Sequence, residues 1–208
     1  HVPVQGRRSG LTVIDKGFHD IPAGQFAVVV THLEMRSPPP ARAVDAPAGV
    51  TFRQVTPTLD WYRDIFRRVG TEWLWFGRLK LERAALEAML KDPARQFYTL
   101  TQDGKDEALL ELYFKPDGDC ELAYFGLTAA LIGSGAGRFL MTQALKLAWE
   151  KPINRLHLNT CTHDSPQALG FYKRSGFVPY KRQIEIDDDP RLTGYLPRDA
   201  APRIPLLD

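Results

Sequence analysis

The segment from Glu121 to Trp149 constrains the fold of this chain more than any other part of the sequence. It begins with Glu121–Leu127, where bulky apolar and aromatic residues alternate as in a mostly buried strand. It ends with Arg138–Trp149, which contains no Pro or Gly and whose apolar residues recur at helical spacing. Glycines occupy every second position from 133 to 137. The segment therefore predicts a strand, a glycine-rich turn and a helix.

Such a turn suits the binding of an anion. Gly133, Gly135 and Gly137 have no Cβ, so the backbone can approach a ligand, and the first N–H groups of the following helix lack internal partners. Phosphate or pyrophosphate is the natural ligand. A Walker loop is excluded because Arg138 and Phe139 follow the last glycine, and a dinucleotide fingerprint would need glycine at position 138.

The turn resembles the acetyl-CoA motif of the GNAT superfamily of N-acetyltransferases, Gln/Arg-x-x-Gly-x-Gly/Ala. Here Ile132 stands where the family usually has Gln or Arg. The resemblance implies that acetyl-CoA is the cosubstrate, with a turn that binds no ligand as the alternative. The residues expected to bind it are Ile132, Gly133, Ser134, Gly135, Ala136, Gly137 and Arg138.

A second match to the same family lies downstream. The family pattern is Asn-x-x-Ala-x-x-x-Tyr-x-x-x-Gly-Phe, and Ala168, Tyr172, Gly176 and Phe177 are in register with it. Ser165 replaces the Asn. The resemblance covers roughly residues 51–186.

The hydrophobic patterns across this region predict a mixed α/β (α+β) sheet with helices on its faces. The order β-α-α-β-β-β-α is the one that a GNAT-type acyltransferase fold implies, and we assign the acetyltransferase domain to residues 50–186. Expected strands are 51–55, 96–102, 107–115, 121–127, 155–162 and 177–186, and expected helices are 58–69, 81–91, 138–149 and 165–175.

The flanking segments are expected to be simpler. Residues 1–10 predict a disordered leader. Strands at 11–15 and 25–35 predict an N-terminal β-hairpin extension, and a Pro-rich linker completes the segment 11–49. The Pro-rich residues 187–208 predict a tail that crosses the surface.

Composition gives no sign of a special class of protein. Of the 208 residues, 44% are hydrophobic and 25% charged, as in ordinary soluble globular proteins, and a net charge of +2 gives no electrostatic argument for nucleic acid or membrane, so neither is expected as a partner. Two cysteines indicate a reducing, cytoplasmic setting. His157, Cys161 and His163 lack a fourth ligand nearby in sequence, so no metal is expected.

Acetyl transfer to an amine needs a base, because an amine with a pKa near 10 is mostly protonated at neutral pH. Glu121 is the candidate, since straight alternation would place it on one face with Phe125 and Leu127. A solvent-facing glutamate is the alternative interpretation, and Glu111 is the second candidate base.

The family resemblance implies that Tyr172 is the general acid that protonates the departing thiolate; a core aromatic residue is the alternative. It also implies that backbone groups at Phe125–Leu127 polarise the carbonyl and bind the pantetheine arm. Ser165 either bonds the CoA arm or only caps a helix.

The sequence thus favours an N-acetyltransferase that moves an acetyl group directly from acetyl-CoA to a primary amine, on a small molecule or a protein. The alternatives are an idle acyl-CoA-binding or regulatory module and a dimerising interaction protein; a homodimer is compatible with either. Trp73, Trp75 and Phe76 line the acceptor pocket or belong to the core. The identity of the acceptor is left open.

Overall fold

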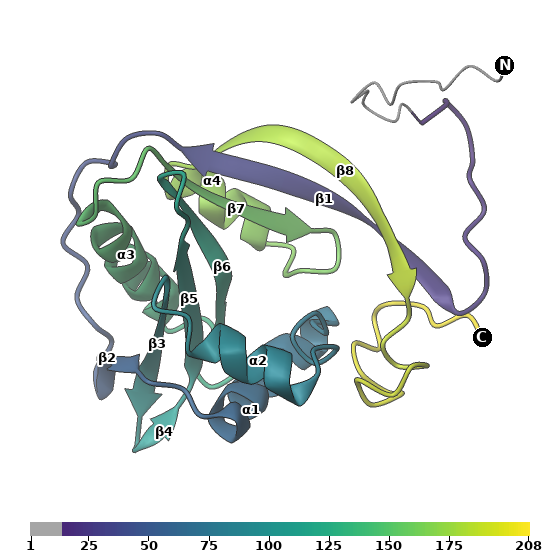
Figure 1. The fold of residues 1–208 in the computed structure, drawn as a ribbon, viewed down its shortest axis with the longest axis horizontal. Coiled ribbons are helices and arrows are strands. Elements are labelled where there is room, and N and C mark those ends of the chain that lie inside the picture. The colour runs from purple at the N-terminus through teal and green to yellow at the C-terminus, as the bar shows by residue number, and fades with distance from the viewer. Residues whose placement is uncertain (1–13) are drawn as a thin grey trace, which may run out of the picture.

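The computed structural model describes residues 14–208 as one curved, eight-stranded sheet flanked by helices (Figure 1). The strand order is β2-β3-β5-β6-β7-β1-β8, with the short β4 beside β3, and among residues 14–208 only β6 and β7 pair in parallel. The strands are β1 (Gln25–Met35), β2 (Val50–Val55), β3 (Arg95–Gln102), β4 (Lys105–Asp106), β5 (Ala108–Phe114), β6 (Asp119–Leu127), β7 (Arg155–Cys161) and β8 (Val178–Asp188). The helices are α1 (Leu59–Gly70), the single 3₁₀ turn η1 (Thr71–Trp73), α2 (Arg83–Leu90), α3 (Ala136–Trp149) and α4 (Ala168–Arg174).

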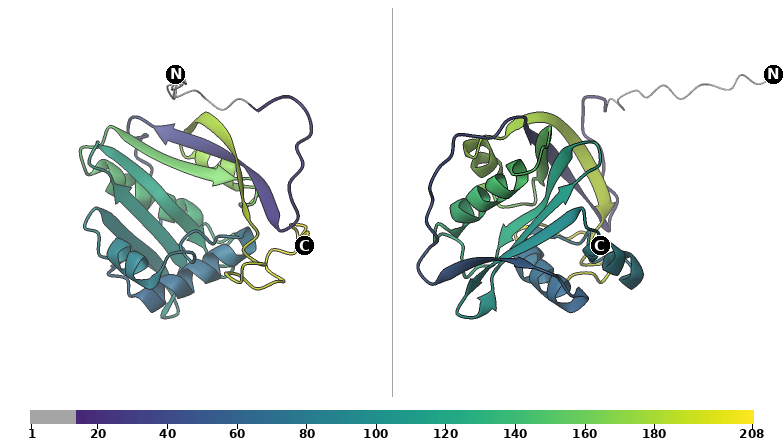
Figure 2. Two further views of the ribbon diagram at one scale, coloured as in Figure 1. Left: turned by 45° about the vertical axis from the view of Figure 1, so that its right-hand side comes forward. Right: turned by 60° about the vertical axis from the view of Figure 1, so that its left-hand side comes forward.

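The helices cover both faces of the sheet, which confirms the predicted mixed α/β class (Figure 2). On one face, α1 and α2 pack against β3, β5 and β6, and buried Tyr62 and Phe66 lie in that cluster. On the other face, α3 packs against β5 and β6, and α4 contributes Phe171 and Tyr172. None of the helices within residues 14–208 is long and apolar enough to cross a membrane.

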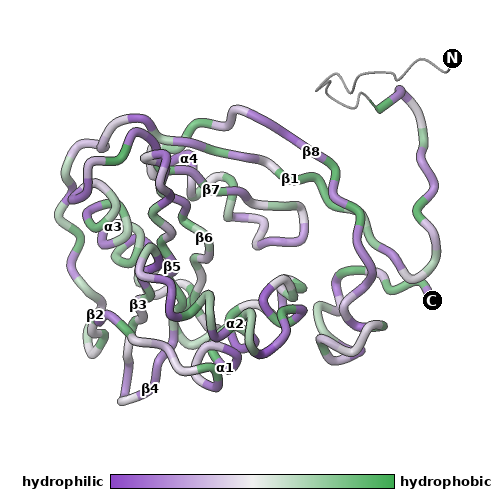
Figure 3. Tube along the Cα trace, viewed as in Figure 1, coloured by the Kyte–Doolittle hydropathy of each residue, from purple (hydrophilic) through white to green (hydrophobic). Residues whose placement is uncertain are grey.

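Gln25–Met35 is a strand, as predicted, but the expected N-terminal hairpin is wrong in its pairing. β1 lies between β7 and β8 and is antiparallel to both. Ile14 and Asp15 are in no strand, and residues 1–13, with the predicted leader, lie outside the described part. Val28 and Leu33, on opposite faces of this interior strand, are both buried, whereas Val29 is 39% exposed. Figure 3 shows the hydrophobic character of much of β1.

Residues 36–49 contain no helix or strand and carry the chain from β1 to β2, at the far edge of the sheet (Figure 1). The C-terminal segment 189–208 also has no regular element, yet it does more than cross the surface. Leu196 and Ala201 are buried in the cluster around α1. Buried Arg191 bonds Asp189 at 2.7 Å and donates to the Ile204 carbonyl at 2.9 Å. These internal partners satisfy a buried cation and fix the segment.

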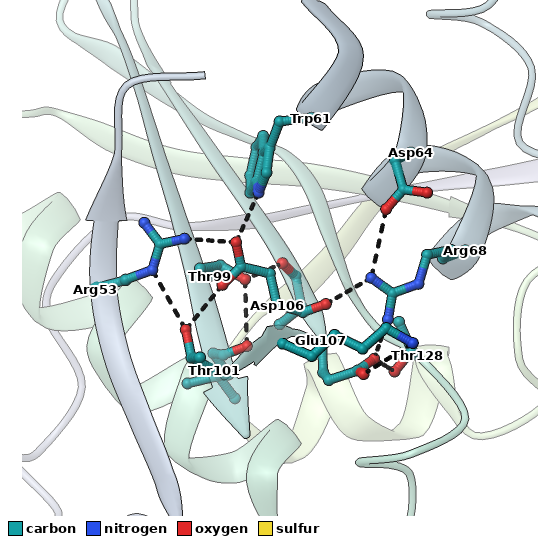
Figure 4. Close-up of polar contacts among 12 residues, drawn as sticks. Arg53, Trp61, Asp64, Arg68, Thr99, Thr101, Asp106, Glu107 and Thr128 are labelled. Atoms are coloured by element: carbon teal, nitrogen blue, oxygen red, sulfur yellow. Dashed lines mark hydrogen bonds and ion pairs between the residues drawn. The ribbon is translucent and has the colours of Figure 1, made fainter. Parts of the chain in front are cut away.

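A polar network connects the sheet to the segment that follows β6 (Figure 4). Buried Glu107, just before β5, accepts hydrogen bonds from the Thr128 hydroxyl and from Arg68 of α1. The Thr128 N–H also donates to the Glu107 carbonyl, at 3.0 Å. Beside it, Arg53 of β2 pairs with Asp106 at 2.5 Å. Thr128 is thereby held in place immediately before the glycine-rich turn.

Glu111 of β5 is completely buried and is the centre of a second network. It accepts hydrogen bonds from Tyr62 at 2.6 Å, from Arg78 at 2.7 Å and from Arg95 at 2.5 Å. Burial raises the pKa of the Tyr62 phenol, and the Glu111 charge raises it further, so the phenol is neutral and donates. The geometry therefore gives Glu111 a structural role: it ties α1 and the chain beyond it to the sheet.

We expect Glu111→Gln to lower the free energy of unfolding by roughly 3–5 kcal/mol, because it removes the buried charge that pairs with two partly buried arginines, Arg78 and Arg95. The measurement is urea unfolding followed by circular dichroism. Glu87→Gln is the matched control, since Glu87 is partly exposed and, among residues 14–208, pairs only with the exposed Arg83, at 2.8 Å; it should cost less than about 1 kcal/mol. Equal losses in the two variants would contradict the structural role of Glu111.

Candidate functional site

The glycine-rich turn has the backbone conformation of an anion site. Gly133 and Gly135 have φ angles of +83° and +91°, which side chains with a Cβ rarely adopt. Gly135 precedes the first turn of α3 with no side-chain cap. The Ser134 hydroxyl donates to the Leu131 carbonyl at 2.8 Å and accepts from the Ala136 N–H at 3.3 Å, which closes the turn on itself.

Four backbone N–H groups of this turn are free to bind a ligand. Within residues 14–208, no hydrogen bond uses the N–H of Ile132, Gly133, Gly135 or Gly137. A Cβ built at Gly133 or Gly135 would meet no atom within 4 Å, so the space above the turn is open. A row of free N–H groups at a helix N-terminus fits the pyrophosphate of acetyl-CoA. Ile132, exposed at 59%, adds no polar side-chain group to this row.

Strands β6 and β7 separate beside this turn. They pair only over Asp119–Glu121 and Arg155–His157. On the α3 side, Phe125 of β6 stacks on Phe171 of α4, with ring centroids 5.7 Å apart, and lies 6.2 Å from the ring of Tyr172. Phe125 and Tyr172, which come from the two predicted parts of the site, are thus brought together.

A β-bulge in β6 overturns the expected alternation of Glu121, Phe125 and Leu127. Leu122 and Tyr124 oppose successive residues of β5, so Ala123 is an extra residue. Beyond the bulge, each residue lies on the face opposite to the one that straight alternation predicts. Phe125 and Leu127 pack in the α3 cluster, whereas Tyr124 packs in the α1 cluster. Glu121 opposes Tyr113 and shares the face of Tyr124.

Glu121 and Tyr172 therefore lie on opposite faces of β6. Glu121 is partly exposed and pairs with Lys115 at 2.9 Å, beside His157 of β7. Burial and the Lys115 charge lower the pKa of His157. Burial raises the pKa of Tyr172 well above 10, and the charge of Asp164 raises it further. Within residues 14–208, no hydrogen bond joins Glu121 to Tyr172.

The predicted helix start at Ser165 is wrong. Residues 165–167 form a turn closed by the Ala168 N–H on the Ser165 carbonyl at 2.8 Å, and α4 begins at Ala168. The Ser165 hydroxyl lies 2.6 Å from Gln167 Oε1, to which it donates. Ser165 therefore orders the turn that leads from β7 into α4.

Asp164 is the residue that the sequence did not single out. Its Oδ2 accepts from the Thr160 hydroxyl at 2.7 Å and from the Cys161 N–H at 2.9 Å, and its Oδ1 accepts from Trp75 Nε1 at 3.0 Å. An aspartate just beyond a strand, here three residues after the end of β7, is a sequence signal for such a turn. Its long-range bond to Trp75 has no such signal.

The aromatic connection between α1 and α2 lies near Asp164. The ring of Trp75 is 5.1 Å from that of Tyr124, and the ring of Phe76 is 5.8 Å from that of Phe26 in β1. Trp73 lies farther out, under Arg203 at 5.1 Å. All of these aromatic residues are partly exposed, so they are only in part core residues.

This arrangement, a sheet with separated strands and a glycine turn at the junction, defines an acyl-CoA-binding transferase fold. Residues 56–177, more than half of the chain, match the sequence profile described as Acetyltransferase (GNAT) family. The chain belongs to this family, as the resemblance in its motifs predicted.

Solved structures support the fold. The chain resembles a GCN5-related N-acetyltransferase from Sphaerobacter thermophilus with a TM-score of 0.57 at 18% identity, over 78% of this chain and 51% of that one. It resembles another from Kribbella flavida with a TM-score of 0.54 at 20% identity, over 82% and 63%. The match therefore spans only half to two thirds of these two structures, and at these identities the likeness shows the fold alone.

A curated relative is more similar over a shorter segment. The mycothiol acetyltransferase of Jonesia denitrificans is 35% identical over 77 residues, which are 37% of this chain and 24% of that protein. The matched segment is thus about a quarter of that relative's length, which supports acetyl transfer in general.

Gly135→Ala should weaken the binding of CoA at least tenfold, because its methyl group enters the open space above the turn. Gly104→Ala, in the turn between β3 and β4, is the matched control: Gly104 has a φ of +75° and equally open surroundings. Both variants should lose a similar stability, about 1–2 kcal/mol, from the strained φ. Calorimetric titration with CoA checks this, and equal affinity in the two variants would place the phosphates elsewhere.

Proposed function

We propose that this protein is an N-acetyltransferase that moves the acetyl group of acetyl-CoA directly to a primary amine. The observation that carries the proposal is the row of free N–H groups at Ile132, Gly133, Gly135 and Gly137, beside the separation of β6 and β7. Membership of the GNAT family supplies the acetyl transfer. The direct route and the amine acceptor are our inference.

The glycine turn would hold the pyrophosphate, with Ser134, Ala136 and Arg138 at its edge. Beyond Glu121 the β7 side of β6 has no strand partner, so the backbone of Phe125–Leu127 is available to bind the pantetheine arm and the thioester carbonyl. Ser165, in the turn that leads into α4, lies on the β7 side of this separation and is our candidate for a further contact with the arm.

The chemistry needs a neutral amine and a protonated leaving group. The amine nitrogen attacks the thioester carbon, and the proton that it loses passes to Glu121, directly or through water. The carbon–sulfur bond then breaks, and the Tyr172 phenol donates its proton to the thiolate. Burial raises the pKa of Tyr172 above its usual range, so it remains protonated at neutral pH and available as the acid.

The other candidate function, an idle acyl-CoA-binding module, is favoured by the two departures from the family motifs, Ile132 and Ser165. A measurement of catalytic turnover distinguishes the acetyltransferase from the idle module. An assay of CoA release with a panel of primary amines should find at least one amine that is acetylated. Binding of acetyl-CoA without release of CoA on any amine would support the module.

With the best amine, Glu121→Gln and Tyr172→Phe should each lower kcat about 10²- to 10⁴-fold at neutral pH and leave acetyl-CoA affinity within a few fold. The loss in Glu121→Gln should shrink toward pH 10, because the amine then deprotonates unaided. The loss in Tyr172→Phe should stay constant to pH 10, because the raised pKa keeps the parent phenol protonated throughout. Parallel losses at every pH would instead indicate packing roles for both residues.

A further inference from the structure

Asp164 is a carboxylate without a cationic partner. Within residues 14–208, no Lys or Arg side chain forms an ion pair with it, whereas Glu121 pairs with Lys115 and Asp187 with Lys80. Asp164 is a partly exposed residue. It is therefore free to attract a cation.

The hydrogen bonds of Asp164 leave one position open. A carboxylate has about four lone-pair sites. Two on Oδ2 are occupied by Thr160 and Cys161, and one on Oδ1 by Trp75. The second lone pair of Oδ1 is therefore open, and it lies next to the Trp75 indole, which donates to the same oxygen. These three donors also fix the carboxylate, so a ligand would meet a preorganised acceptor.

The contact of Asp164 with Trp75 places it near the proposed site of acetyl transfer. Asp164 follows β7, and the Trp75 side chain that it holds packs against β6 beyond Glu121, where β6 has no β7 partner. The ring of Trp75, held by Asp164, packs edge-on against Tyr124 at 5.1 Å.

The adjoining surface is aromatic. Phe26 of β1 lies 5.8 Å from Phe76 and 5.2 Å from the ring of His163, and all three side chains are partly exposed. Burial and the charge of Arg203 lower the pKa of His163, so its imidazole is neutral at neutral pH and does not compete for Asp164. A carboxylate beside aromatic rings suits an ammonium group attached to an apolar body.

We propose that Asp164, with Trp75 and Tyr124, binds the ammonium group of the acceptor, and that this acceptor is a primary amine on an aromatic or apolar group. The inference rests on the proposed function and names its substrate class. Asp164 orients the amine toward the thioester, and Glu121 remains the proton acceptor.

The test uses 2-phenylethylamine as the probe and 2-phenylethanol as its neutral match. Titrations of ¹⁵N-labelled protein by nuclear magnetic resonance give both dissociation constants. We expect the amine to bind at least tenfold more tightly than the alcohol, with the largest shifts at the indole N–H of Trp75 and the amide of Asp164. Trp75→Phe identifies the indole signal among those of the four tryptophans.

Asp164→Asn should weaken binding of the amine at least tenfold and leave binding of the alcohol unchanged. Glu185→Gln is the matched control, because Glu185 is an exposed carboxylate on β8 that forms no ion pair among residues 14–208; it should leave both constants unchanged. Equal effects of the two variants, or equal affinities of the parent for amine and alcohol, would overturn the proposal. If Asp164→Asn does not fold, shifts in the parent that avoid Trp75 and Asp164 would overturn it.

Titration of the parent with acetyl-CoA keeps this inference separate from the proposed function. Absence of acetyl-CoA binding would refute the acetyltransferase assignment, whereas acetyl-CoA binding without selective amine binding would refute only the role of Asp164. Asp164→Asn should bind acetyl-CoA within threefold of the parent.

Discussion

The separation of β6 from β7 is the constraint on which the rest of the site depends. The two strands share three residue pairs and then part, so one edge of β6 loses its strand partner over Phe125–Leu127. Backbone groups on that edge need other hydrogen-bond partners. An extended ligand arm that lies along the strand would supply them, in the manner of an added strand. The bulge at Ala123 lies in the same stretch and places Tyr124, instead of Phe125, on the face of Glu121.

Long-range contacts hold the separated parts of β6 and β7 in place where the two strands share no hydrogen bonds. Glu107 anchors Thr128 at one end, just before the glycine turn. At the other end, Asp164 bonds Trp75 across the separation, and Arg203 of the C-terminal segment donates to the carbonyl of His163. The C-terminal segment thus helps to place the loop between β7 and α4 relative to the aromatic connection. Its buried residues anchor a proline-rich stretch without regular elements to the cluster around α1.

The elements of the structure that were predicted correctly from sequence were those whose signal is local. Helix α3 and the strand before it follow from hydrophobic periodicity, and Gly133 and Gly135 have the positive φ angles that only glycine adopts easily. The bulge could not be predicted, because it exists only in the register between β5 and β6, and counting straight through 121–127 placed Glu121 on the wrong face. The position of β1 was also missed, since its partners β7 and β8 lie more than a hundred residues away in sequence.

The central claim is that the free N–H groups of the glycine turn bind the pyrophosphate of acetyl-CoA. Amide hydrogen exchange, resolved by residue with and without acetyl-CoA, tests this directly. The account predicts new protection at Ile132, Gly133, Gly135 and Gly137, together with protection along Phe125–Leu127, and little change in the turn at Gly104. Protection that appears elsewhere while these four amides exchange as fast as before would contradict it.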